Sequence, residues 1–370
     1  MFKNKATASE AKSDALSPPA GGGSDKWVTG RSKARWAKME QKRIKPGRLL
    51  RIATWNVRSG STAEARQLIA AEMARLNIDV MAITELRMKG NGKSEIPIPG
   101  TDESITCFHS GGEKHEYGVG FFVRRWIKAT VASFTPVNER ICHLQLYGTI
   151  KVNIICAYAP TEVSLDCNKD KFYDDLQLFC DRVPKREIAI ELGDMNAHLG
   201  SNRTGWETVL GKYSRGMVND NGTRLLSFAC NNNLRITNTF FRHRLKHVLT
   251  WRSPSGKDKS TIDFVMISNR FASSIVDTRV YRSADCSSDH HLLLSKFKLR
   301  LRSVKNISRS VRLDWTVLKQ APMQDEFQLH LSNRFSALCE PSNLSPESLM
   351  DQLEITVKEV GQFVCPKVDR

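Results

Sequence analysis

Short apolar runs of the kind that form β-strands recur between residues 49 and 300, and several of them end in an acidic or amide side chain. Runs of about four to eight such residues, bounded by turn-forming residues, are typical of strands with at least one buried face. Strands therefore outnumber helices in this region. The expected strands cover residues 50–55, 78–84, 119–123, 141–146, 152–158, 188–192, 234–237, 249–251, 262–267 and 291–297.

Helical patterns separate some of these runs. Residues 62–76 place Ala65, Ile69 and Met73 on one helical face, residues 172–183 form a second apolar stripe, and residues 225–232 predict a third helix. The glycines at 90–92 and 111–112 predict loops. Short strand meanders that alternate with helical crossovers favour an α/β fold, with two mixed sheets packed face to face and helices outside, over a simple parallel sheet.

The charge balance favours a polyanionic partner. The chain has 370 residues, with 56 Lys and Arg against 39 Asp and Glu, and a formal net charge of +17. A strongly basic protein of this kind commonly binds nucleic acid. No apolar run reaches the roughly 18 residues of a membrane span, and no secretory signal is recognisable. Nine cysteines without a C-x-x-C pair argue against a zinc finger and for a reducing compartment. We therefore expect no membrane partner and an intracellular location.

Composition divides the chain into three parts. Residues 1–48 carry 12 Lys and Arg against 4 acidic residues and include Pro18-Pro19 and three consecutive glycines. This predicts a flexible basic tail, either a solvated arm or a nucleic-acid contact. Residues 49–300 form the expected folded core. Residues 301–370 hold nine basic and nine acidic residues and two amphipathic helical stripes, which must pack on each other, on the core, or on a partner or domain absent from this chain.

The first candidate site residues follow the first two strands. Glu85 leaves an apolar strand, where a carboxylate is costly unless it has a partner, so we expect it to hold a metal ion rather than to be a strand-end acid that reaches solvent. Asn56 follows Trp55 at the end of the first strand. It is well placed to hydrogen-bond the metal ligand or a substrate phosphate, although asparagine is also common in turns.

A stronger signal is the run Gly193-Asp194-Met195-Asn196 after another strand. The glycine lets the backbone turn, and an acid and an amide two residues apart can face the same pocket. Asp194 can then orient and deprotonate a water molecule, and Asn196 can hold a phosphate oxygen. The alternative is an Asx turn without a catalytic role.

Three further segments supply an acid–histidine pair and a phenol. Asp263 lies within a strand-like run, and Asp289-His290 follows 26 residues later. A buried aspartate commonly fixes the tautomer of a histidine and stabilises its charged form. His290 would then donate to the transition-state phosphate, and Asp289 would assist the metal or the water. His291 is the weaker candidate because it faces the other side of the strand. Tyr158 ends its strand before Ala159-Pro160, where its hydroxyl can stabilise developing charge or simply belong to the core.

In order and character these motifs resemble the endonuclease/exonuclease/phosphatase superfamily over residues 49–300, and in detail the endonuclease domains of RTE-clade non-LTR retrotransposons. The resemblance implies a four-layer α/β sandwich, a site at one edge of both sheets, dependence on Mg²⁺ or Mn²⁺, and a segment after residue 300 similar to the linker to a reverse transcriptase. The motifs are TWNVRSG from Thr54, ITELR from Ile83, AYAPT from Ala157, GDMNAHLG from Gly193, LTWRSP from Leu249, TIDFV from Thr261 and SDHHLLL from Ser288.

Two positions depart from the pattern. Arg58 stands where abasic-site endonucleases of the superfamily carry a second acid, and Thr84 replaces a glutamine often found before the metal-binding glutamate. Arg58 favours a phosphate contact over a second metal. We take Asn56, Arg58, Asn196 and Trp251 as the candidate substrate contacts.

The leading interpretation is a Mg²⁺-dependent DNA endonuclease that nicks one strand, with a nuclear location. A second interpretation is a domesticated protein that binds DNA or chromatin with little or no cleavage, for which a broken site is expected. A third is a phosphatase of the same fold, but its usual Cys-Asp-Arg run is absent near Lys259-Ser260-Thr261.

Overall fold

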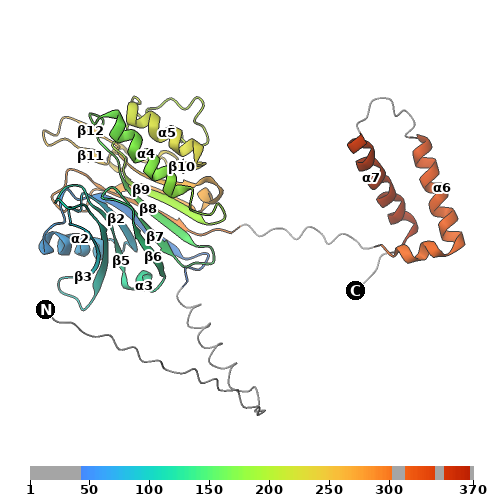
Figure 1. The fold of residues 1–370 in the computed structure, drawn as a ribbon, viewed down its shortest axis with the longest axis horizontal. Helices are drawn as coiled ribbons and strands as arrows, with labels where there is room; N and C mark the ends of the chain where they lie inside the picture. Colours follow the sequence, from blue (N-terminus) through green and yellow to red (C-terminus); the bar gives the residue numbers. More distant parts are fainter. Residues whose placement is uncertain (1–42, 302–312, 338–345, 367–370) are drawn as a thin grey trace, which may run out of the picture. The chain divides into compact units, whose positions relative to one another are not determined.

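The computed structural model describes residues 43–301, 313–337 and 346–366 (Figure 1). The chain divides into two compact units, residues 1–300 and residues 301–370. Most of the expected basic tail, residues 1–42, lies outside the described residues. Ile44 belongs to the expected tail of residues 1–48 and is described. It is fully buried, and its backbone forms a bridge with Gly148. The packed core of the first unit therefore begins before β1.

Two mixed sheets build the first unit. In the seven-stranded sheet the order is β14-β15-β1-β2-β5-β4-β3, and β1 is parallel to β2 and antiparallel to β15. The strands of this sheet are β1 (Leu49–Asn56), β2 (Val80–Thr84), β3 (Asn91–Pro97), β4 (Ser104–Ser110), β5 (Val119–Arg124), β14 (Ile275–Tyr281) and β15 (Leu292–Lys298).

The six-stranded sheet has the order β10-β13-β9-β8-β7-β6. Its central strands β8 and β9 are parallel, and β13 pairs antiparallel with β9. A separate hairpin, β11 (Trp251–Arg252) with β12 (Lys259–Ser260), precedes β13. The strands of the six-stranded sheet are β6 (Val131–Pro136), β7 (Ile141–Leu146), β8 (Val152–Tyr158), β9 (Ile188–Asp194), β10 (Leu234–Ile236) and β13 (Asp263–Ser268).

Helices cover the outer face of each sheet (Figure 1). α2 (Ala63–Arg75) packs on the seven-stranded sheet, and α4 (Asp166–Cys180) and α5 (Asp220–Asn231) pack on the six-stranded sheet. A third apolar cluster fills the space between the two sheets. The expected four-layer α/β sandwich is confirmed. The shorter helical segments of this unit are α3 (Arg125–Lys128), η1 (Thr237–Thr239), η2 (Leu245–His247) and η3 (Asn269–Ser274).

Strand alternation carries polar residues to one edge of the space between the sheets. On β9, Ile190 and Leu192 belong to the core between the sheets, so Asp194, two residues further, faces the same side. The same alternation applies to Asn56 after Ile52 on β1, and to Asp263 before Val265 on β13. The residues that fill the core thus also direct the polar strand ends toward each other.

Some sequence expectations for the elements were wrong. β3, β4, β6 and β14 were not predicted, and the loop expected at 90–92 overlaps the start of β3. β3 is an edge strand that buries only Ile96, so its sequence lacks the apolar run that reveals an interior strand. α5 begins at Asp220, because Asn219 caps it through a hydrogen bond from the Gly222 amide. The strand expected at 249–251 is reduced to two residues of β11.

The second unit contains η4 (Trp315–Lys319), α6 (Ala321–Ala337) and α7 (Pro346–Val364). The two helices pack against each other, with the ring of His330 4.7 Å from that of Phe363. Trp315 closes the hairpin edge-on against Phe327. The interpretation of residues 301–370 as a linker to a further domain stays a prediction. Within the described residues, no helix is long and apolar enough to cross a membrane.

Candidate active site

Asn56 joins two acids at the shared edge of the sheets. Its Nδ2 donates to Glu85 Oε1 and to Asp194 Oδ2, both at 2.9 Å. Asn56 is fully buried, whereas Glu85 lies just after β2 at the rim. One amide group thus fixes the distance between a rim carboxylate and a buried one. Because the Asn56 amide donates to Glu85, a metal ion bound by Glu85 Oε1 would replace this hydrogen bond.

Asp194, Asp263 and His290 form a compact buried group. Their ligand-type atoms all lie within 4.8 Å of one another, and among the described residues this is the set of acidic and histidine side chains close enough to hold a metal ion. His290 Nδ1 is 3.0 Å from Asp263 Oδ2, and Nε2 is 3.8 Å from Asp194 Oδ2. The acid–histidine pair expected from the sequence is therefore in contact.

The protonation of this group follows from its burial and its charges. Burial alone lowers the pKa of His290, but the charges of Asp263 and Asp194 outweigh it and raise this pKa to about 9. Burial and the neighbouring Asp263 raise the pKa of Asp194 above its ordinary value, although the charge of His290 opposes this. The arrangement therefore favours a protonated imidazole beside a carboxyl group of unusually high basicity.

Tyr158 and Asn196 line the same edge. The Tyr158 hydroxyl donates to Glu85 Oε1 at 3.0 Å. Burial and the charges of Glu85 and Asp194 raise the pKa of Tyr158 far above its ordinary value, so the phenol keeps its proton. The Asn196 backbone amide donates to Asp194 Oδ1 at 3.0 Å, which is an Asx-type turn, and its side-chain Nδ2 donates to the Ala159 carbonyl. The structure therefore shows the Asx turn, and a catalytic role for Asn196 stays a prediction.

The segment before β15 is hydrogen-bonded to the hairpin of β11 and β12. Trp251 Nε1 donates to Asp289 Oδ2 at 3.0 Å, and its backbone forms a bridge with His290. Arg58 Nε lies 3.7 Å from the other Asp289 oxygen. Arg58, Trp251 and Asp289 therefore form a second, more exposed group. His291, the weaker histidine candidate, is bonded through its backbone amide to Thr250.

Backbone strain is concentrated at this edge. Arg58, Glu85 and Asn196 have φ values of 56°, 54° and 46°. Residues other than glycine rarely adopt this left-handed conformation, and it persists where the surrounding structure enforces it. Asn196 and Glu85 are thus held in positions that a relaxed chain would not choose.

Sequence analysis missed several contacts of the site. Arg87 Nη2 pairs with Glu85 Oε2 at 2.6 Å, and its place in the ITELR motif could have indicated this. Arg140 donates to the Tyr158 carbonyl and lies over the Tyr117 ring at 3.9 Å. No motif surrounds Arg140, so only the tertiary structure reveals it. Thr250 Oγ1 accepts the backbone amide of Asp263 at 3.2 Å.

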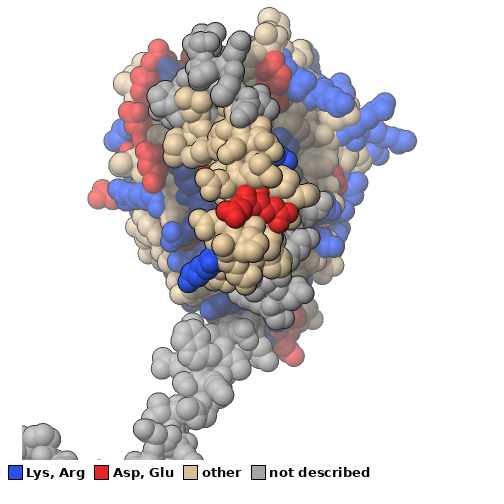
Figure 2. Space-filling view, turned by 90° about the vertical axis from the view of Figure 1, so that its right-hand side faces the viewer, with Lys and Arg blue, Asp and Glu red and all other residues tan. Residues whose placement is uncertain are grey.

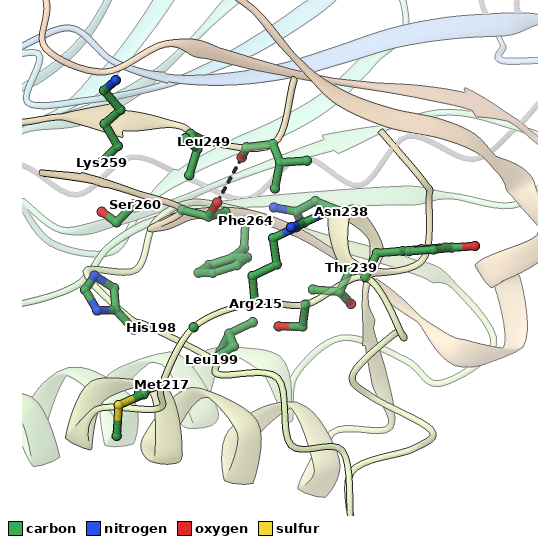
Figure 3. A pocket seen from close by; sticks show the side chains of 15 residues that line it. His198, Leu199, Arg215, Met217, Asn238, Thr239, Leu249, Lys259, Ser260 and Phe264 are labelled. Carbon is green, nitrogen blue, oxygen red and sulfur yellow. Dashed lines mark hydrogen bonds between the residues drawn. The ribbon is translucent and has the colours of Figure 1, made fainter. Parts of the chain in front are cut away.

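A pocket of about 200 Å³ is lined by Phe264 of β13 and by residues of the segments that precede it (Figure 3). It combines apolar walls from Leu199, Leu249 and Phe264 with the basic side chains of Arg215 and Lys259. Asn238, also in its lining, donates to the Asp263 carbonyl at 3.0 Å. The pocket is therefore joined directly to the strand that carries Asp263.

The donor set fits a hard divalent cation. Several carboxylates meet at this edge, and Asp289 Oδ1 is buried without a hydrogen-bond partner in the described part of the chain. Oxygen ligands of this kind suit Mg²⁺ or Mn²⁺, and Mg²⁺ keeps several of its waters. A hydrated ion suits the rim near Glu85 better than the dry position between Asp263 and His290.

Comparison with known proteins identifies the class. Residues 53–290 match the family described as the Endonuclease/Exonuclease/phosphatase family. The chain belongs to this family, as its motifs predicted. Craniofacial development protein 2 of Bos taurus is 31% identical over 263 residues, which are 71% of this chain and 43% of that protein. The corresponding protein of Tragulus javanicus is 31% identical over 262 residues, 44% of its length. The chain thus spans less than half the length of these relatives.

The fold is also similar to that of a solved structure. The AP endonuclease LMAP from Leishmania major has a TM-score of 0.50 at 13% identity, covering 68% of this chain and 89% of that one. The endonuclease domain of TRAS1, a telomere-specific non-LTR retrotransposon, has a TM-score of 0.47 at 15% identity, covering 69% of this chain and all of that domain. At such low identity the likeness to LMAP concerns the fold alone.

Proposed function

We propose that the first unit is a divalent-metal-dependent DNA endonuclease that hydrolyses a phosphodiester bond and nicks one strand. The observation that carries this proposal is the buried Asp194–Asp263–His290 group, which Asn56 links to Glu85 at the rim. Members of a phosphoester-cleaving family need a base, a cationic donor and a place for a metal ion, and this edge supplies residues for all three.

Each residue has a defined part in the proposed reaction. Asp194, with its raised pKa, accepts a proton from the attacking water. His290, kept cationic by Asp263, donates to a phosphoryl oxygen and stabilises its charge. Tyr158 and Asn196 supply neutral donors beside it. Because these groups are already held by the fold, little reorganisation is needed when the phosphate arrives.

We assign the cation to the rim. Glu85 would hold Mg²⁺ or Mn²⁺, with Asn56, which contacts it, and Asp289 as the proposed supporting residues. A bound divalent ion supplies positive charge to the phosphoryl oxygens and lowers the pKa of coordinated water. Arg58, Trp251 and Asn196 are the proposed contacts for the substrate around the scissile phosphate.

DNA is the proposed substrate because the chain carries a net charge of +17 and its motifs resemble retrotransposon endonuclease domains. A DNA substrate would place the protein in the nucleus. Binding to DNA or chromatin without cleavage, and phosphatase activity on small phosphoesters, are the rival functions. The complete set of site residues favours cleavage over binding alone.

The test is nicking of supercoiled plasmid by the purified full chain. We expect open-circular product with Mg²⁺ and none with EDTA. Asp194→Asn and His290→Ala should each slow nicking by at least about a hundredfold, the scale of losing a proton acceptor or a transition-state donor. Plasmid binding without nicking by the wild-type chain would reject the enzyme and support the binding function. Wild-type rates in both variants would reject the assigned residues.

A further inference from the structure

A second basic surface lies outside the candidate active site, on the segment between η1 and β11. In residues 242–247 basic residues at even positions alternate with His243, Leu245 and His247. Arg242, Arg244 and Lys246, here called the basic loop, are all exposed. The segment contains no acidic residue. His243 and His247 are partly buried, whereas the three cations are exposed, and Leu245–His247 forms the short 3-10 helix η2.

The two histidines are fixed. His243 Nε2 is 2.7 Å from Asp277 Oδ1, and His247 Nδ1 is 3.1 Å from the Val280 carbonyl oxygen. Both partners belong to β14, the edge strand of the seven-stranded sheet. Asp277 is also approached by Arg279 at 3.9 Å. Its charge is therefore shared between two neighbours and leaves the exposed cations of the loop without a carboxylate partner on β14.

The pairing of β14 with β15 shows which end of the basic loop lies near the candidate active site. Tyr281 is opposite Leu292, two residues after His290, and Val280 is opposite Leu293. His247 is therefore anchored near the site. His243 is anchored three residues further along β14, roughly 10 Å away at about 3.3 Å per residue. The His247 end of the loop therefore lies near the candidate active site, and the His243 end lies further along the sheet edge.

The chain also joins the two places directly. Three residues after His247, Thr250 accepts the backbone amides of Ile262 and Asp263 through its hydroxyl. Arg252, which follows on β11, is exposed and bonded through its backbone to Asp289. Exposed cations therefore continue from the rim of the site onto the loop.

We propose that the basic loop binds the phosphodiester backbone of duplex DNA in the flank beside the scissile phosphate. This rests on the proposed function for the identity of the polyanion. Lys and Arg neutralise phosphates without reading the base sequence. Successive nucleotides of one strand rise by about 3.4 Å, so the 10 Å between the two anchors corresponds to about three nucleotides. The loop holds DNA along the sheet edge while the site acts on one bond.

The experiment measures binding of a fluorescent duplex of about 30 base pairs, in EDTA, as a function of salt. The variant carries Arg242→Ala, Arg244→Ala and Lys246→Ala together and keeps both histidines, so that the anchors remain. Each lost phosphate contact lowers the slope of log affinity against log salt by about 0.9, so the slope should fall by up to about 2.7. A matched control carries Arg182→Ala, Lys185→Ala and Arg186→Ala, three exposed cations after α4 that remove the same charge.

The result expected is a lower slope for the loop variant and a nearly unchanged slope for the control. An unchanged slope in the loop variant, with circular dichroism showing a folded protein, would overturn the proposal. An equal fall in both variants would also overturn it, because net charge alone would then explain the effect. Nicking by the wild-type chain is scored separately, so that loop-dependent binding without nicking rejects the enzyme and leaves the loop assignment intact.

Discussion

At the scale of single residues, the site depends on carboxyl groups placed in very different surroundings. Glu85 is at the rim with three hydrogen-bond donors from Asn56, Tyr158 and Arg87. Asp194 is buried, and its pKa is raised. A rim acid can exchange partners for a hydrated ion, whereas a buried acid suits proton transfer. The assignment of the two roles therefore follows from exposure.

Replacement of Glu85 tests the metal assignment. Glu85→Gln keeps the size of the side chain and removes its charge, so about tenfold more Mg²⁺ should be needed for the half-maximal nicking rate, a loss of about 1.4 kcal/mol in binding the ion. Glu113→Gln, at an exposed acid in a loop, serves as the control. A Mg²⁺ titration that is identical for wild type and Glu85→Gln would remove Glu85 from the metal site.

Glu191 gives a prediction about pH that is independent of catalysis. It lies on the outer face of β9, accepts a hydrogen bond from the Cys180 thiol at 3.2 Å, and has one buried oxygen without a partner among the described residues. Burial raises the pKa of Glu191 to about 7. Below pH about 4.5 the carboxyl is protonated in both the folded and unfolded states, and stability is greatest with respect to this group.

As pH rises toward 7 the unfolded chain ionises first, so the folded state loses up to about 3 kcal/mol, at about 1.36 kcal/mol for each pH unit between the two pKa values. Glu191→Gln should abolish this contribution. The measurement is the free energy of unfolding in urea at pH 5 and pH 8 for both proteins. The difference between wild type and variant should change between these pH values. Parallel behaviour would show that Glu191 ionises alike in both states.

At the scale of elements, close contact between β8 and β9 allows Asp194 to reach the site. Gly193 has a φ of 153°, and a Cβ atom there would lie 1.8 Å from the Ala157 carbonyl oxygen of β8. The pairing of Tyr158 with Asp194 follows one step later along the same two strands. The glycine in the motif is thus required by strand packing as well as by the turn.

Gly193→Ala should therefore lower the free energy of unfolding by at least about 3 kcal/mol, because backbone must move to admit the methyl group. Gly205→Ala is the comparison: its φ is 83°, but nothing lies within 4 Å of the added atom. It should cost only about 1–2 kcal/mol of backbone strain. Equal losses in urea unfolding for the two variants would mean that the β8 contact does not matter.

At the scale of the whole molecule, positive charge is distributed unevenly. Figure 2 shows both acidic and basic side chains on the side that it draws. Residues 1–42 contain nine Lys and Arg against four acidic residues. In the proposed complex with DNA, both this segment and the basic loop would add affinity without selecting a sequence.

Deleting residues 1–42 should weaken DNA binding and reduce its salt dependence while leaving the free energy of unfolding unchanged. Deleting residues 1–48 should also cost about 1.5–3 kcal/mol of stability, because it removes the buried Ile44. Salt titrations and urea unfolding of the two truncated chains distinguish these effects. Equal stability of both would show that Ile44 does not support the core, and an unchanged salt slope would place the tail away from DNA.

The sequence alone determined the class of fold and the family. Short apolar runs and the helical stripes between them specify the two sheets and their covering helices, because burial of those faces leaves few alternatives. The motifs also indicated Asn56, Asp194, Asp263 and His290. Edge strands such as β3 and β14 were not predicted from the sequence, because they bury too few side chains to leave an apolar pattern.

Only the tertiary structure decided how the groups pair. Asn56 bridges Glu85 and Asp194 across the two sheets, and the Tyr158 hydroxyl of the six-stranded sheet reaches Glu85 after β2 of the other sheet. These contacts join residues up to 138 positions apart, so no local pattern encodes them. Arg140 and the histidine anchors of the basic loop were invisible for the same reason. Their roles arise from strand order and register, which depend on the packing of the whole core.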